Sequence, residues 1–128
     1  MSSIGTIAAQ ALAYQATVMA TAAQNIVNAR VGAPATAAGE ILGAVYQPKT
    51  VAGVTTAEGG VSAKLLPVTP ATHLVFDGTS PTGYSAMPNV DLGNEMATLM
   101  MASSSYRAAT RLVAVESALS TTLRQLLA

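Results

Sequence analysis

Few residues in this sequence could carry out chemistry, and none has the partners that the chemistry requires. The chain has a single histidine, His73, and no cysteine. A catalytic or metal-binding histidine needs a nucleophile or further ligands close to it, and none lies near His73 in the sequence. The only closely spaced acids, Asp91 and Glu95, stand at the expected start of a helix, where capping and a favourable interaction with the helix dipole explain them.

Two further segments share residue types with functional motifs but lack the surrounding pattern. Ser103-Ser104-Ser105 has neither the flanking glycines of a nucleophile elbow nor a paired histidine. Gly59-Gly60 lacks the spacing of a dinucleotide-binding or phosphate-binding loop. We therefore expect a small polar helix surface and a turn at these positions. We expect no enzymatic activity, no catalytic or metal-binding residues and no cofactor.

Arg107 and Arg111 are the most specific charged pair. They are four residues apart on an expected helix, where like charges repel modestly, and no acid lies three or four residues from either of them. One interpretation is that a partner surface supplies the opposite charge. The other is that both side chains are solvated and that their aliphatic stems cover apolar surface.

Composition excludes several classes of protein. The 128 residues suffice for one ordinary domain, but only 9% are charged, and the net charge is zero. Nucleic-acid binding needs clustered basic residues, so we expect none. No stretch reaches about 18 consecutive apolar residues, so we expect no membrane span. The N-terminus lacks the basic and apolar regions of a cleaved signal peptide, and we expect no such cleavage.

The C-terminal segment 89–128 predicts one long helix. It follows Pro88, which disfavours a helix before it, and either Asn89 or Asp91 could cap its first turn. A helix of about 36 residues would be about 54 Å long, whereas a compact domain of this size would be only about 28 Å across. We therefore expect this helix to protrude and to need a partner.

The N-terminal segment Ser2 to Ala29 predicts a second helix. Either Ser2 or Ser3 could cap it, its apolar residues recur at helical spacing, and no charged residue precedes Arg30. A helix without charges on any face suits a position surrounded by protein. The alternative is a partly frayed alanine-rich helix that lies on its own domain.

The segment between the helices predicts β-structure. Short β-prone runs alternate with Gly and Pro signals, and the best hairpin is closed by the turn at 57–60. The predicted strands are Ile41–Tyr46, Lys49–Thr55, Val61–Leu66 and Leu74–Phe76. We thus expect an α+β fold of paired long N- and C-terminal helices with a small β-hairpin-rich middle, divided as 1–31, 32–88 and 89–128.

The apolar residues of the two helices predict a seam between them within one chain. On each helix these residues recur mainly at spacings of three and four, as in an amphipathic helix. The predicted seam places Leu12, Val18, Met19 and Ile26 against Leu112, Val115, Leu119 and Leu123.

Two groups of residues resemble a known family. The segment 22–29, which contains Asn25-Ile26-Val27-Asn28, resembles the N-terminal signature of bacterial flagellar rod and hook proteins. The C-terminal part is similar to that of the proximal rod proteins of this family. The residues that carry this similarity are Gly83-Tyr84, Met87-Pro88-Asn89-Val90-Asp91, Glu95-Met96, Met100-Met101-Ala102 and Ser105-Tyr106-Arg107-Ala108.

The resemblance implies a structural subunit of the flagellar rod in the periplasm. In this family the terminal helices pair as a coiled coil, the middle is β-rich, and the subunits stack helically into a shaft that transmits torque. It implies export through the flagellar type III apparatus and contacts with copies of itself, other rod proteins, the rod-base adaptor and the MS ring. The matching motif and interface positions are Asn25, Asn28, Pro88, Asn89, Glu95, Met96, Tyr106, Arg107 and Arg111.

A different class remains open beside the rod subunit. A monomeric helical export adaptor, or a secreted effector, would also have charge-poor helices that bind one client. The two classes differ in their assemblies, because an adaptor forms a finite complex whereas a rod subunit polymerises.

Overall fold

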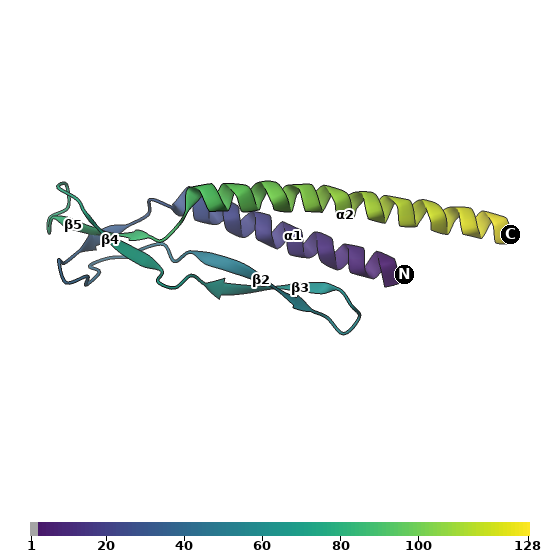
Figure 1. Ribbon diagram of the computed structural model, residues 1–128, viewed down its shortest axis with the longest axis horizontal. Coiled ribbons are helices and arrows are strands. Elements are labelled where there is room, and N and C mark those ends of the chain that lie inside the picture. Colours follow the sequence, from purple (N-terminus) through teal and green to yellow (C-terminus); the bar gives the residue numbers. More distant parts are fainter. Residues whose placement is uncertain (1–2) are drawn as a thin grey trace.

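The computed structural model describes residues 3–128, and it consists of two antiparallel helices beside a β-rich middle (Figure 1). Its elements are α1 (Ser3–Asn28), β1 (Ala33–Ala35), β2 (Lys49–Thr55), β3 (Val61–Pro67), β4 (Thr72–Phe76), β5 (Tyr84–Pro88) and α2 (Leu92–Leu127). The α+β class, the two terminal helices and the β-rich middle are therefore as predicted.

The start of α2 is fixed by Asp91, which decides between the two predicted caps. Its Oδ1 accepts a hydrogen bond from the backbone N–H of Asn94 at 3.1 Å, which satisfies a donor that the helix itself leaves free. Asn89 does not cap the helix. Its side chain instead donates a hydrogen bond to the carbonyl of Pro70 at 2.9 Å. This bond ties the entry of α2 to the segment before β4.

The two helices differ in length, and this difference leaves part of α2 without a neighbour. α1 has 26 residues and α2 has 36, which correspond to about 39 Å and 54 Å. Figure 1 shows α2 extending past the start of α1. The predicted capping position Ser2 lies outside the described residues.

The strands form two separate antiparallel sheets. β2 and β3 make a two-stranded hairpin that lies along α1, and the other sheet has the order β1-β5-β4 (Figure 1). The hairpin turn is closed by Thr56, whose N–H donates to the carbonyl of Gly60 at 2.9 Å, and Gly59 has a φ of +82° that favours glycine. A hairpin alone is only marginally stable in water, so the β2–β3 hairpin depends on its contact with α1.

The prediction of a strand at Ile41–Tyr46 is wrong. This segment makes only a single bridge, from Ile41 to Ala35, and then crosses back so that Tyr46 N–H donates to the carbonyl of Val31 at 3.1 Å. The strands that complete the sheet are instead β1 and β5, which the sequence analysis did not predict. They are short, contain Ala and Pro, and carry almost no β-propensity signal.

The enclosed core contains no large aliphatic or aromatic side chain within the described residues. Apart from prolines, its apolar members are all alanines: Ala8, Ala22, Ala33, Ala35, Ala86 and Ala102. The largest fully buried side chains are Asn25, Pro48 and Pro88. Elements therefore approach one another closely through small side chains, while the large apolar residues lie nearer the surface.

The predicted seam between the helices is wrong for its α2 half. Its α1 members are half-buried, but Leu112, Val115, Leu119 and Leu123 are 47%, 56%, 64% and 58% exposed. The side of α2 that faces α1 instead includes Glu95, which bonds to α1, and the buried Ala102. Since successive residues are about 100° apart, the four large residues lie roughly 100° around α2 from that side.

The close packing of the hairpin on α1 predicts a specific effect at Gly60. A Cβ there would overlap the side chain of Gln10, which accepts a hydrogen bond from Thr56 Oγ1 at 3.2 Å. We expect Gly60→Ala to lower the free energy of unfolding by about 1 to 3 kcal/mol, measured by urea denaturation.

Gly78→Ala is the matched control, because nothing lies within 4 Å of a Cβ at that position. If Gly60→Ala is as stable as this control, the end of the Gln10 side chain moves aside at no cost, and its hydrogen bond to Thr56 adds nothing measurable to stability. Adding Gln10→Ala removes the overlapping side chain, so the two changes should be non-additive.

Candidate assembly interface

Asn25 joins four segments of the chain through its side-chain amide. It is 0% exposed, and its Nδ2 donates to the carbonyl of Lys49 and to Glu95 Oε1, both at 2.7 Å. Its Oδ1 accepts from the Tyr46 hydroxyl at 2.9 Å and from the Lys49 N–H at 3.2 Å. These four bonds use the full capacity of an asparagine amide, and they connect α1, the loop before β2, β2 and α2.

The hydroxyl of Tyr46 is held in its protonated form at this junction. Burial raises the pKa of Tyr46 above its ordinary value, and the nearby carboxylate of Glu95 raises it further. Ionisation would remove the proton that the hydroxyl donates to Asn25. The junction therefore depends on a neutral tyrosine.

Other residues of the predicted family motif also lie where the helices meet the sheet. The Nδ2 of Asn28 donates to the carbonyl of Gln24, one turn earlier in α1, at 2.9 Å. Pro88 ends β5 and is fully buried, and Asn89 follows it with the bond to Pro70 described above. Asn25, Glu95, Pro88 and Asn89 thus hold elements of the molecule together, whereas the bond of Asn28 stays within α1; Asn89 is exposed and Asn28 is half-buried.

The remaining predicted interface residues are exposed on α2. Met96 and Tyr106 are 57% and 36% exposed, and Arg107 and Arg111 are exposed as well. Arg107 lines a shallow depression together with Leu99 and Met100. Of the predicted site residues, those on the outer surface of α2 are thus available to a partner.

The sequence carried no signal for the partners of Asn25, but it did carry one for the polar turn after β4. Tyr46 and Lys49 carry no signal of their role, because their contacts with Asn25 span 21 and 24 residues. The turn after β4 was detectable as an Asp-Gly-Thr-Ser sequence typical of turns. There, hydrogen bonds from Thr79 and then from Ser85 lower the pKa of Asp77.

The residues considered for chemistry are not assembled into a site. His73 is exposed on β4, where it pairs with Met87. In the part of the chain that the structure describes, no three His, Cys, Asp or Glu side chains gather to hold a metal ion. Among the described helices, none has the length and apolar character to cross a membrane.

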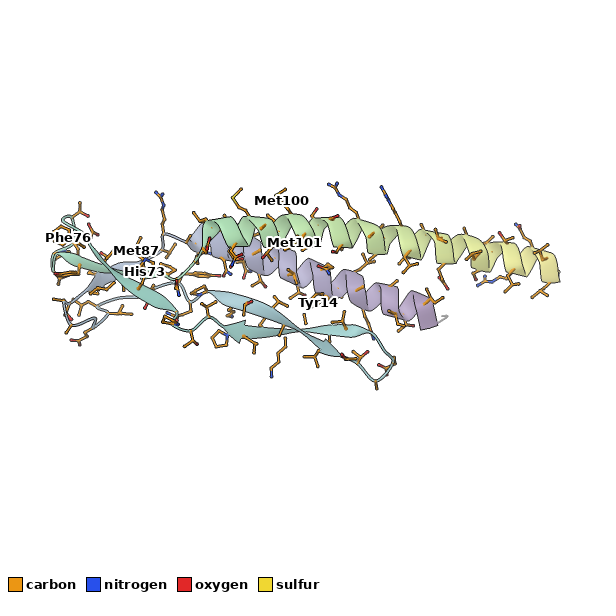
Figure 2. All side chains as sticks on the ribbon, viewed as in Figure 1. Tyr14, His73, Phe76, Met87, Met100 and Met101 are labelled. Atoms are coloured by element: carbon orange, nitrogen blue, oxygen red, sulfur yellow. The ribbon has the colours of Figure 1, made fainter. Side chains whose placement is uncertain are left out.

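A second surface feature lies at the opposite end of the molecule from the α2 terminus. Phe76 is 79% exposed, and Figure 2 shows it at the far end of the sheet, away from the helices. Its ring meets that of Tyr84 edge-to-face, with 5.9 Å between the centroids. This pair stands at the end of the β4–β5 strand pair, where Phe76 and Tyr84 are partners in the register.

The comparisons with known proteins add no relative. The chain matches no protein-family model, and it matches no curated protein. The family resemblance therefore depends on the sequence motifs given above.

Asn25→Asp tests the junction directly. It would place a second carboxylate oxygen beside Glu95 Oε1 and the Lys49 carbonyl, where two donated bonds now lie. We expect a loss of about 3 kcal/mol or more in the free energy of unfolding, measured by urea denaturation. Asn28→Asp, the same change one turn later, should cost less than about 1 kcal/mol, and equal losses would contradict this assignment.

The raised pKa of Tyr46 predicts a loss of stability in alkaline solution. Because its pKa is higher in the folded than in the unfolded state, its contribution is fully present below the ordinary tyrosine value, about 10. It is lost as the pH rises through the folded-state pKa. Unfolding measured at a series of pH values should show this decline, and Tyr46→Phe should be less stable at neutral pH but show a flatter profile. An unchanged decline in Tyr46→Phe would assign the effect to other groups.

Proposed function

We propose that this protein is a structural subunit of the bacterial flagellar rod, of the proximal FlgC type, with no enzymatic activity. The observation that carries the proposal is the surface of α2. Only Ala102 of this 36-residue helix is buried, while its large side chains from Leu92 to Leu127 are largely exposed. An apolar surface of this length is typical of an interaction site, and polymerisation would cover it along its whole length.

The pattern of the helices supports their pairing as a coiled coil. On α2, Glu95, Ala102, Ala109 and Glu116 recur every seven residues and are among the less exposed positions. On α1, Ala8 and Ala22 are the buried positions of a similar repeat. A seven-residue repeat keeps one face of each helix against its partner over many turns.

In this proposal the protein acts as one element of a drive shaft. Copies of it stack helically with other rod proteins in the periplasm, and the first copies contact the rod-base adaptor and the MS ring. The shaft transmits torque and encloses the channel for exported axial proteins. The subunit itself reaches this place through the flagellar type III apparatus. Long side-by-side helix contacts would resist the shear that torque imposes.

Leu119→Asp tests the function, with Ala114→Asp on the same helix as its matched control. Because Leu119 is 64% exposed, the isolated variant should keep its stability to within about 1 kcal/mol. We expect it nevertheless to be missing from basal bodies and to abolish swimming, since a charge would enter an apolar contact. Both effects are measured by complementing a deletion strain.

The outcome that contradicts the rod proposal is normal swimming by the deletion strain itself. A purified chain that forms only a finite complex with one exported client would instead support the export adaptor. Normal swimming with Leu119→Asp alone would reject the assignment of this surface to assembly.

A further inference from the structure

α2 carries a stripe of large apolar side chains that are largely exposed, although Met101 and Leu119 border depressions shared with α1. Met101, Leu112, Val115, Leu119 and Leu126 are 65%, 47%, 56%, 64% and 78% exposed. The exposed residues Ser105, Ala108 and Thr122 fill the remaining positions of the same spacing. We call these eight residues the outer stripe.

The spacing of the outer stripe specifies the kind of partner that it fits. From Met101 to Leu126 the steps alternate between four and three residues without interruption, which is a repeat of 3.5 residues. Such a repeat keeps its residues facing a second helix that winds around the first. A second α-helix fits this spacing, because its own side chains can follow the stripe over several turns.

The chemistry of the outer stripe narrows the partner further. None of its eight positions is charged, so the face that covers it must also be uncharged and must leave room for Leu and Met side chains. A face of this kind exists on α1 of the same protein. Its exposed residues alternate in steps of four and three in the same way: Ala9, Ala13, Ala16, Ala20, Ala23 and Val27.

This face of α1 is not used within its own chain. The contact with α2 involves another side of α1, on which Ala8 and Ala22 are 1% exposed. The hairpin contacts a third side of α1, at Gln10 and Tyr14. Val27, at the end of the alanine face, is 74% exposed. A helix of another molecule can therefore reach this face without displacing α2 or the hairpin.

We propose that the outer stripe of α2 binds the alanine face of α1 in a second copy of this chain. This inference rests on the proposed function as a rod subunit and names the contact between neighbours. The alanine face, from Ala9 to Val27, is about 27 Å long and the outer stripe about 37 Å. The stripe thus spans the whole of the alanine face.

The two surfaces differ, which determines the type of assembly. Each copy offers large side chains on α2 and receives large side chains on α1. A contact between unlike surfaces leaves one of each free at the ends of any open chain of subunits, so growth can continue, whereas a two-fold dimer would use the same surface twice. This property agrees with a polymerising subunit.

Cross-linking tests the contact, since the chain has no cysteine of its own. Copies with Ala16→Cys are mixed with copies with Val115→Cys at high concentration and treated with a short bismaleimide. The control replaces Val115→Cys with Thr110→Cys, an exposed position on another side of α2. We expect the yield of cross-links between Ala16→Cys and Val115→Cys copies to be at least tenfold above the yield with this control. Equal yields would overturn the proposal, and so would predominant linkage of Val115→Cys copies to each other, which indicates a two-fold pairing of α2.

A second variant tests the same contact without cross-linking. Ala16→Leu fills the alanine face, and because Ala16 is exposed the monomer should remain folded. We expect it to reduce at least tenfold the cross-linking of copies with Ala20→Cys, one turn from Ala16 on the same face, to copies with Val115→Cys. Ala114→Leu on α2 should leave the yield unchanged. An unchanged yield with Ala16→Leu would overturn the proposal.

Isolated basal bodies separate the failure of this contact from the failure of the proposed function. If the protein is present in basal bodies but Ala16→Cys and Val115→Cys copies do not cross-link there, the contact is wrong and the rod function stands. If basal bodies lack the protein while purified copies cross-link as expected, the contact stands and the rod function is wrong.

Discussion

The buried amide of Asn25 is the interaction on which the rest of the structure depends. Its four hydrogen bonds fix α1 against the beginning of β2 and the first turn of α2. A polar group enclosed in this way is stable only while each bond is made, because an unsatisfied buried donor or acceptor costs about 1 to 3 kcal/mol. The junction therefore specifies one arrangement of helices, hairpin and sheet in a chain whose apolar core is too small to specify it.

The core consists mainly of alanines, and the larger apolar residues are half-buried or exposed. Alanine faces let helices and strands approach closely but bury little apolar area, so they contribute modest stability at about 25 cal/mol per Å². The Leu and Met side chains that would normally fill a core lie instead on the outside of α2. In the isolated chain these large side chains therefore contribute little apolar burial.

The two parts of α2, and two of its sides, have different surroundings. Its first half is held by the Asn25 junction and by packing against α1, while its last turns extend past the start of α1 (Figure 1). One side of the helix faces α1 with small residues, and a neighbouring side presents large ones. Two differently composed faces on one helix suit a subunit that has both an internal and an external partner.

The elements with local signals were predictable from the sequence alone. The helical spacing of apolar residues located both helices, and glycines near 59 located the hairpin, with β2 ending as predicted at Thr55. The side of α2 that meets α1 was not predictable from the sequence, because two stripes on that helix have the same spacing. The stripe of larger residues suggested the wrong side. The tertiary structure also decided the pairing of β1 with β5 and the partners of Asn25, which include Glu95, 70 residues away. These features depend on contacts distant in the sequence between small or polar residues, for which no local periodicity exists.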